Sequence, residues 1–105
     1  MTHQTPEISI EAYAAERHIG VTIDVRERAE FAQAHVPGAV LMPMGQLASR
    51  LNEIDRSRRV HVICASGNRS KAMTELLVAA GFDPVSVAGG TRAWISSGRA
   101  VEVGL

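Results

Sequence analysis

The chain has little of what several protein classes require. Its 105 residues include one cysteine, one tryptophan, one tyrosine and two phenylalanines. A single cysteine cannot form an internal disulfide, so the fold must depend on the burial of apolar side chains. No apolar run approaches the roughly 18 residues of a membrane span, and the polar opening lacks the basic-then-apolar pattern of a signal peptide. We therefore expect neither membrane insertion nor export, and a cytoplasmic protein.

An excess of charge of one sign is also missing. Eleven basic and eleven acidic residues give a formal net charge of +0, whereas domains that bind nucleic acid carry a basic face. The four histidines are scattered and, with a single cysteine, do not give the spacing of a tetrahedral zinc site. We expect no metal, no organic cofactor and no nucleic-acid partner. The small neutral surface favours a monomer.

The composition that is present is globular, with 46% hydrophobic and 21% charged residues. A chain of this length forms one domain, residues 1–105. Short apolar runs alternate with amphipathic segments, which indicates an α/β fold. We predict strands at 8–10, 21–25, 39–42, 60–63 and 85–87, and helices at 11–18, 28–34, 46–54, 70–80 and 91–97. The run at 60–63 suits a central parallel strand that is buried on both faces.

The most informative segment follows that central strand. The strand stops at Cys64, small and polar residues follow, and a long helix begins near Ser70. Ligands of α/β sheets bind beyond the carboxyl ends of the strands. Gly67 permits a left-handed backbone, so that the loop can turn successive N–H groups inward as an anion-binding nest. The helix N-terminus and the Arg69 cation add to the field, and all three predict a lowered pKa for the Cys64 thiol.

A lone cysteine is more often a small buried hydrophobic residue than a reactive one. The strand-end position, Gly67, Arg69 and the following helix together favour the functional interpretation. Cys64 is therefore the candidate nucleophile. The candidate anion-binding loop consists of Ala65, Ser66, Gly67, Asn68, Arg69 and Ser70.

Three motifs occur in order along the chain. The first is Ile23-Asp24-Val25-Arg26 with Glu30-Phe31 and His35-Val36-Pro37-Gly38-Ala39. The second is the loop pattern Cys64-x-x-Gly67-x-Arg69-Ser70, and the third is Gly89-Gly90-Thr91-Arg92-Ala93-Trp94. In this order and spacing, the motifs resemble those of the rhodanese family of single-domain sulfurtransferases. The resemblance implies an α/β fold with a central five-stranded parallel sheet and helices on both faces.

The resemblance also implies a reaction. The Cys64 thiolate would attack the sulfane sulfur of a small donor anion, thiosulfate or a low-molecular-weight persulfide, and keep that sulfur as a persulfide. An acceptor would then remove it: cyanide in an assay, or a small thiol or a protein cysteine in the cell. Backbone N–H groups from Ala65 to Ser70 would hold the persulfide anion.

One departure from the family affects the donor. Ala65 stands where many members that use thiosulfate carry arginine, and this removes a cation from the rim of the pocket. The pathway and the physiological donor and acceptor are not determined by the sequence.

Two other functions remain as alternatives. A non-catalytic rhodanese module used for protein binding or regulation usually lacks the cysteine that this chain retains. A cysteine-dependent phosphatase or arsenate reductase has one residue more between the cysteine and the arginine than the four found here. The shorter loop suits a single sulfur atom.

Side chains of the first motif are candidates for supporting roles. Asp24 could accept N–H bonds from the loop or pair with an arginine, and the structural role is favoured. Arg26 and Glu30 are expected to form an exposed ion pair of about 0–1 kcal/mol. For His35, bridging a turn is favoured over relaying a proton.

Two further residues complete the candidate site. Lys71, beside Arg69 in the first helical turn, hints at a contact with a donor anion. Trp94 is expected in the core, with its segment near the rim of the pocket.

Overall fold

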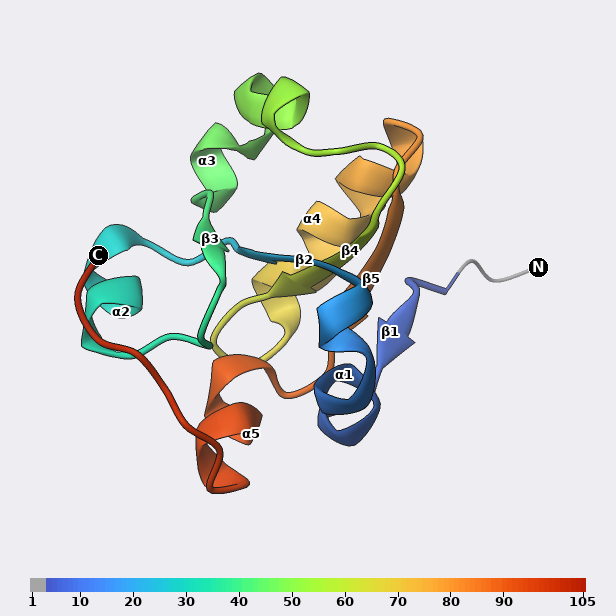
Figure 1. Ribbon diagram of the computed structural model, residues 1–105. Coiled ribbons are helices and arrows are strands. Elements are labelled where there is room, and N and C mark those ends of the chain that lie inside the picture. Colours follow the sequence, from blue (N-terminus) through green and yellow to red (C-terminus); the bar gives the residue numbers. More distant parts are fainter. Residues whose placement is uncertain (1–3) are drawn as a thin grey trace.

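Five parallel strands form the centre of the molecule, in the order β1-β5-β4-β2-β3 (Figure 1). The computed structural model describes residues 4–105. The strands are β1 (Glu7–Ile8), β2 (Gly20–Asp24), β3 (Val40–Leu41), β4 (Arg59–Ile63) and β5 (Asp83–Val87). The helices are α1 (Ile10–Glu16), α2 (Arg28–Gln33), α3 (Met44–Leu47), α4 (Asn68–Ala79) and α5 (Gly90–Ser96), with 3₁₀ segments at Arg17–Ile19 and Ala48–Glu53.

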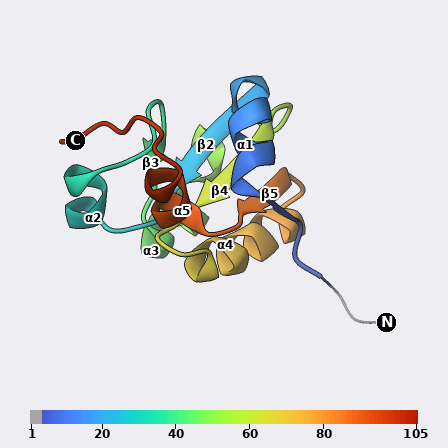
Figure 2. The same ribbon diagram turned by 90° about the horizontal axis from the view of Figure 1, so that it is seen from below.

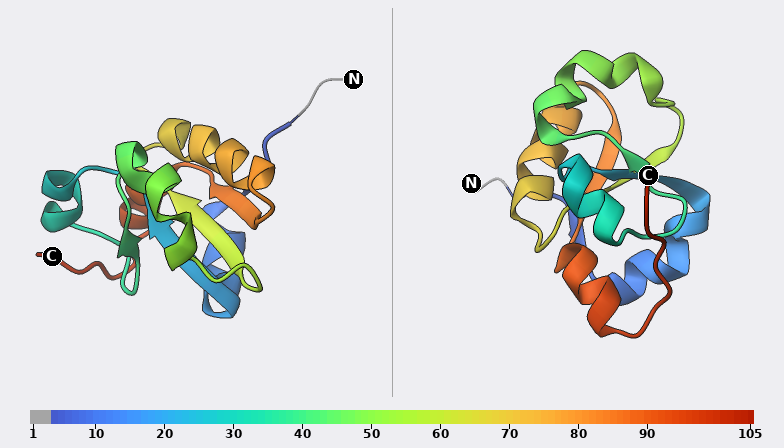
Figure 3. Two further views of the ribbon diagram at one scale, coloured as in Figure 1. Left: turned by 90° about the horizontal axis from the view of Figure 1, so that it is seen from above. Right: turned by 90° about the vertical axis from the view of Figure 1, so that its left-hand side faces the viewer.

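Helices cover both faces of this sheet, which confirms the predicted fold class. One apolar cluster lies under α3, the second 3₁₀ segment and α4, and includes Val60, Val62 and Leu77. The other lies under α1 and α5 and includes Ile63 and Trp94. Figures 2 and 3 show α4 on one side of the sheet and α1 on the other.

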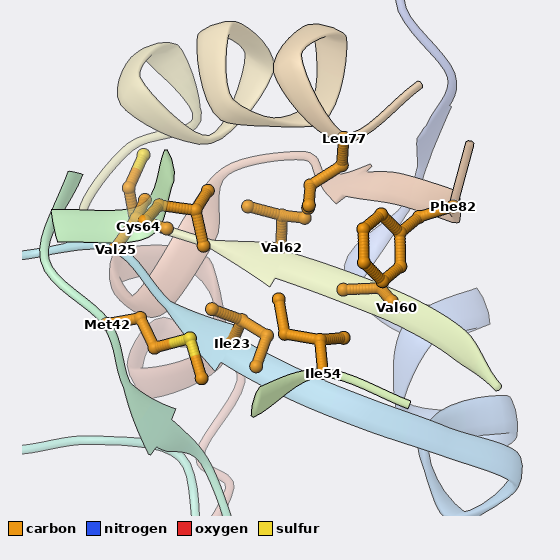
Figure 4. Close-up of a cluster of buried hydrophobic side chains, with 10 residues drawn as sticks. Ile23, Val25, Met42, Ile54, Val60, Val62, Cys64, Leu77 and Phe82 are labelled. Carbon is orange, nitrogen blue, oxygen red and sulfur yellow. The ribbon is translucent and has the colours of Figure 1, made fainter. Parts of the chain in front are cut away.

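Strand β4 is central, as its sequence predicted. It pairs with β2 on one side and with β5 on the other. Successive side chains of a strand point to opposite faces, so Val60 and Val62 enter one cluster and Ile63 the other. This alternation places Cys64, the next residue, in the cluster that packs against α4 (Figure 4).

The first strand and helix are shifted from the prediction. Strand β1 is Glu7–Ile8 rather than 8–10, because Ser9 caps α1 and accepts a hydrogen bond from the Ala12 N–H at 3.1 Å. Ile10 thus starts the helix and packs under it.

The segment at 46–54 is not one helix. It consists of α3 followed by the 3₁₀ segment, with a kink at Arg50 where φ is −118° and ψ is 17°. The spacing of its apolar residues nevertheless predicted burial correctly, since Leu47 and Ile54 are both in the core.

Candidate active site

Cys64 lies at the carboxyl edge of the sheet, directly after β4. Its neighbour Ile63 accepts a hydrogen bond from the Val25 N–H at 3.0 Å, which ties this edge to the end of β2. Figure 4 shows Cys64 beside Val25 at one end of the apolar cluster. The residue is 1% exposed. A reactant must therefore be small, or must present a narrow group, to reach the sulfur.

A tight turn holds the sulfur at the start of α4. Gly67 adopts φ 111°, the left-handed backbone that its lack of a Cβ makes accessible, and its N–H donates to the Cys64 Sγ at 3.1 Å. The helix begins at Asn68, so Asn68, Arg69 and Ser70 form its first turn. The predicted helix start near Ser70 was two residues too late. The left-handed Gly67 completes the turn, so the helix already begins at Asn68.

Two buried serine hydroxyls form a chain of polar contacts that starts at the Cys64 sulfur. The Cys64 Sγ lies 3.4 Å from the Ser70 Oγ, and the Ser70 Oγ lies 2.8 Å from the Ser86 Oγ. Both serines are fully buried. Ser86 was missed by the sequence analysis, although a polar residue among the buried residues of β5 was a usable signal. It lies opposite Val62 on β4, and this pairing brings it near the loop.

These contacts set the ionisation of Cys64. Burial alone raises the pKa of the thiol, because it disfavours the charged form. Hydrogen bonds from the Ser70 side chain and from the backbone of Ser70, Gly67 and Ser66 outweigh burial, and the pKa lies below the ordinary thiol value. The lowered pKa predicted from the sequence agrees with this geometry.

The third motif packs directly on the Cys64 loop. The N–H of Thr91 donates to the Cys64 carbonyl at 2.8 Å, and the N–H of Arg92 donates to the Ala65 carbonyl at 3.0 Å. Gly90 has φ 58°, and a Cβ added there would lie 2.4 Å from the Cys64 carbonyl oxygen and 2.7 Å from that of Ala65. This glycine is required because the two backbones touch.

Residues of the first motif, at the end of β2, stabilise the same carboxyl edge of the sheet. Asp24 is fully buried and forms a bidentate pair with Arg26, the shortest contact being 2.9 Å. Arg26 also donates to the Ala34 carbonyl at 2.8 Å, beyond the end of α2. The structural role favoured for Asp24 is thus supported by its contacts.

Comparison with known proteins agrees with this arrangement. The family model of the rhodanese-like domain matches residues 9–97. The chain belongs to the rhodanese-like domain family.

Relatives of the domain carry sulfur-related names. A sulfurtransferase of Allochromatium vinosum is 31% identical over 99 residues, covering 93% of this chain and 92% of that protein. YrkF of Bacillus subtilis, provisionally named a sulfur carrier protein, is 36% identical over 94 residues. That match covers 85% of this chain and 50% of YrkF, so the chain spans about half the length of this relative.

A solved structure shares the fold along almost its whole length. The crystal structure of a rhodanese-related protein from Thermoplasma volcanium superposes with a TM-score of 0.89 at 30% identity. The match covers 93% of this chain and 98% of that one.

In this rhodanese-like domain, the predicted exposed pair of Arg26 and Glu30 is wrong. Arg26 is buried against Asp24, and Glu30 instead forms a bidentate pair with Arg69, with both N–O distances at 2.8 Å. Arg69 lowers the pKa of Glu30 to about 2. The pair joins α2 to the first turn of α4. The positive charge of Arg69 near Cys64 is therefore partly neutralised by the Glu30 carboxylate.

His35 lies in a different part of the domain. Its ring stacks on Phe31 with centroids 3.6 Å apart, and its Nδ1 lies 2.8 Å from the Phe31 carbonyl oxygen. It lines a cleft of about 510 Å³ together with residues of α2, β3 and the C-terminal segment. No residue of the Cys64 loop lines this cleft. These contacts favour the bridging role over a proton relay.

Lys71 and Trp94 also have structural partners. The Lys71 Nζ lies 3.5 Å from a Glu7 carboxylate oxygen. Trp94 is 5% exposed, packs edge-to-face on Tyr13, and lies under the guanidinium groups of Arg17 and Arg99. The expected core position of Trp94 is confirmed.

No group of three or more His, Cys, Asp or Glu side chains between residues 4 and 105 is placed to hold a metal ion. His3, included in the sequence argument about zinc, lies outside the described residues. Within the same range, no helix has the length and apolar character needed to span a membrane.

The hydrogen bond to Ser70 predicts a measurable shift in reactivity. Because that hydroxyl favours the thiolate, the Ser70→Ala variant should show a higher apparent pKa for Cys64 alkylation. The measurement is the rate of iodoacetamide addition against pH, followed by intact mass. The midpoint of the wild-type profile should lie below pH 8.5, roughly the pKa of a free thiol. Superimposable wild-type and variant profiles would contradict the assigned cause.

Proposed function

We propose that the protein is a sulfurtransferase that carries a sulfane sulfur on Cys64 as a persulfide. The observation that carries this proposal is the enclosed Cys64 sulfur, which the Gly67 N–H and the Ser70 hydroxyl contact at the start of α4. The names of the relatives support the same activity. The chemistry needs no metal or organic cofactor, because the thiolate itself is the nucleophile.

The reaction consists of two displacements at sulfur. In the first, the Cys64 thiolate attacks the outer sulfur of thiosulfate, a new S–S bond forms, and the old S–S bond breaks with its electron pair leaving on sulfite. With an organic persulfide, the leaving group is the thiolate of the donor. In the second, a thiol, a protein cysteine or cyanide attacks the outer sulfur, and Cys64 departs as thiolate.

The enclosure of Cys64 favours this carrier role. The outer sulfur of a persulfide stands about 2 Å beyond the cysteine sulfur. An acceptor therefore does not need to reach Sγ itself, only the atom bonded to it. The N–H groups of Ser66, Gly67 and Ser70, which lower the pKa of the thiol, are also the nearest donors for a persulfide anion.

The alternative activities have less support. A phosphatase or arsenate reductase must surround a tetrahedral oxyanion, and the four residues between Cys64 and Arg69 make a short loop in which the arginine is bound by Glu30. A purely regulatory module has no need for the bonds that lower the pKa of Cys64. The cytoplasm, which keeps thiols reduced, is the compartment we propose.

The proposal is tested by weighing the intact protein. Wild-type protein is incubated with thiosulfate or with glutathione persulfide and then freed from the donor. We expect an increase by the mass of one sulfur atom, reversed by cyanide with release of thiocyanate. Without any gain of mass from either donor, the proposal is wrong, and hydrolysis of an aryl phosphate would then identify the phosphatase alternative.

A further inference from the structure

The positively charged side chains nearest to Cys64 in sequence already form ion pairs with carboxylates. Arg69 is held by both carboxylate oxygens of Glu30, and Lys71 lies beside Glu7. Ala65, the residue after the nucleophile, carries no charge. A small anionic donor therefore finds no unpaired cation on the Cys64 loop itself or in the first turn of α4.

Arg92 supplies a cation from a neighbouring helix. Its backbone N–H binds the Ala65 carbonyl at 3.0 Å, so its Cα is held against the loop. The two backbones are closely packed, because Gly90 lies against the Cys64 and Ala65 carbonyls with no room for a Cβ. Side chains of a helix tilt toward its N-terminus, and it is this end of α5 that meets the loop.

The Arg92 side chain is available for a ligand. Arg92 is exposed, and among residues 4–105 no carboxylate, carbonyl oxygen or aromatic ring pairs with its guanidinium. Within the described range, Arg28 is the other arginine without such a partner, and it lines the separate cleft beside His35. Arginine binds carboxylates and other oxyanions through two parallel hydrogen bonds, more specifically than a point charge does.

We propose that Arg92, held against Ala65 by its own backbone, binds the oxyanion group of the incoming sulfur donor. This inference rests on the proposed function and adds a residue that recognises the donor, which is then a small sulfane-sulfur compound that carries a sulfonate or carboxylate. The guanidinium would hold the sulfonate of thiosulfate, or a carboxylate of a peptide persulfide, while the sulfane sulfur points at Cys64. When thiosulfate reacts, the pair of electrons from the broken bond leaves on the sulfite that Arg92 holds.

The test compares donors that differ in charge. Arg92→Gln should raise the KM for thiosulfate and for glutathione persulfide about tenfold, the change that corresponds to roughly 1.4 kcal/mol. The kcat should change little, and the KM for an uncharged alkyl persulfide should be unchanged. A rise for thiosulfate alone assigns Arg92 to the sulfonate, and a rise for the glutathione donor alone assigns it to the carboxylate. Arg92→Lys should recover part of the affinity.

The matched control is Arg28→Gln, which removes another exposed and unpartnered arginine, one that lines the separate cleft beside His35. It should leave all three KM values at the wild-type level. Equal KM changes for charged and uncharged donors in Arg92→Gln, or equal effects of the two variants, would overturn the inference.

Alkylation separates this inference from the proposed function. Iodoacetate and iodoacetamide differ in one negative charge, and both react with a cysteine whether or not it transfers sulfur. Arg92→Gln should lower the ratio of the iodoacetate rate to the iodoacetamide rate severalfold, and Arg28→Gln should not. A lowered ratio without any persulfide in wild type would reject the sulfurtransferase but keep Arg92 as an anion-binding residue. An unchanged ratio rejects Arg92 even in an active sulfurtransferase.

Discussion

Replacing Cys64 by serine is expected to lower sulfur transfer by about a thousandfold or more. Serine keeps a similar size and can still accept from the Gly67 N–H, but its hydroxyl does not ionise near neutral pH and does not form a stable persulfide analogue. The rate of thiocyanate formation from thiosulfate and cyanide gives the effect directly. The variant should also gain no sulfur in the intact-mass experiment.

Because Cys64 is also part of the core, stability must be measured beside activity. The fully buried Val62 and Leu77 belong to the same cluster, and serine replaces a sulfur there by a hydroxyl group. The contacts to Gly67 and Ser70 offer partners for that hydroxyl, so we expect a folded protein with a similar thermal midpoint. A folded Cys64→Ser variant that still forms thiocyanate at the wild-type rate would remove Cys64 from the mechanism.

Replacing Gly90 by alanine is expected to destabilise the domain by more than about 3 kcal/mol. The added Cβ would lie 2.4 Å from the Cys64 carbonyl oxygen and 2.7 Å from that of Ala65, and φ is 58°. Since backbone atoms cannot move aside as a flexible side chain can, either α5 or the Cys64 loop must shift. Denaturant unfolding measures the loss of stability, and sulfur transfer should fall with it.

Gly98→Ala provides the control for backbone strain. Gly98 has φ 79°, but nothing lies within 4 Å of a Cβ added there. Its cost should be only that of a left-handed alanine, about 1–2 kcal/mol. Equal losses in the two variants would show that strain, rather than the close packing of Gly90 on the loop, determines the effect.

The local features of the candidate active site were predictable because they depend on residues close in sequence. A run of β-branched residues ending at Cys64, then Gly67 and a long helix, predicts a strand, a tight turn and a helix N-terminus. Those elements in turn place the thiol among backbone N–H groups. The fold followed from the alternation of strands and helices together with the three rhodanese motifs.

Contacts between distant segments were not predictable in the same way. Glu30 and Arg26 are four residues apart, a spacing that suggested a pair, yet Glu30 binds Arg69 from another element. Ser86 meets Ser70 only because β5 lies next to β4 in the sheet. Spacing along a helix describes neighbours on one element, and it carries no information about which other element packs there.

The order of residues along the chain therefore determined where the candidate nucleophile lies, how its loop turns and which layers surround it. The tertiary structure alone decided which charged side chains around the Cys64 loop are paired and which are not. Glu30 of α2 pairs with Arg69 of α4, and the close packing of Gly90 on the Cys64 loop brings the backbone of Arg92 to Ala65. The physical reason is that the interaction between two charged groups depends on their distance in space and not on their separation along the chain.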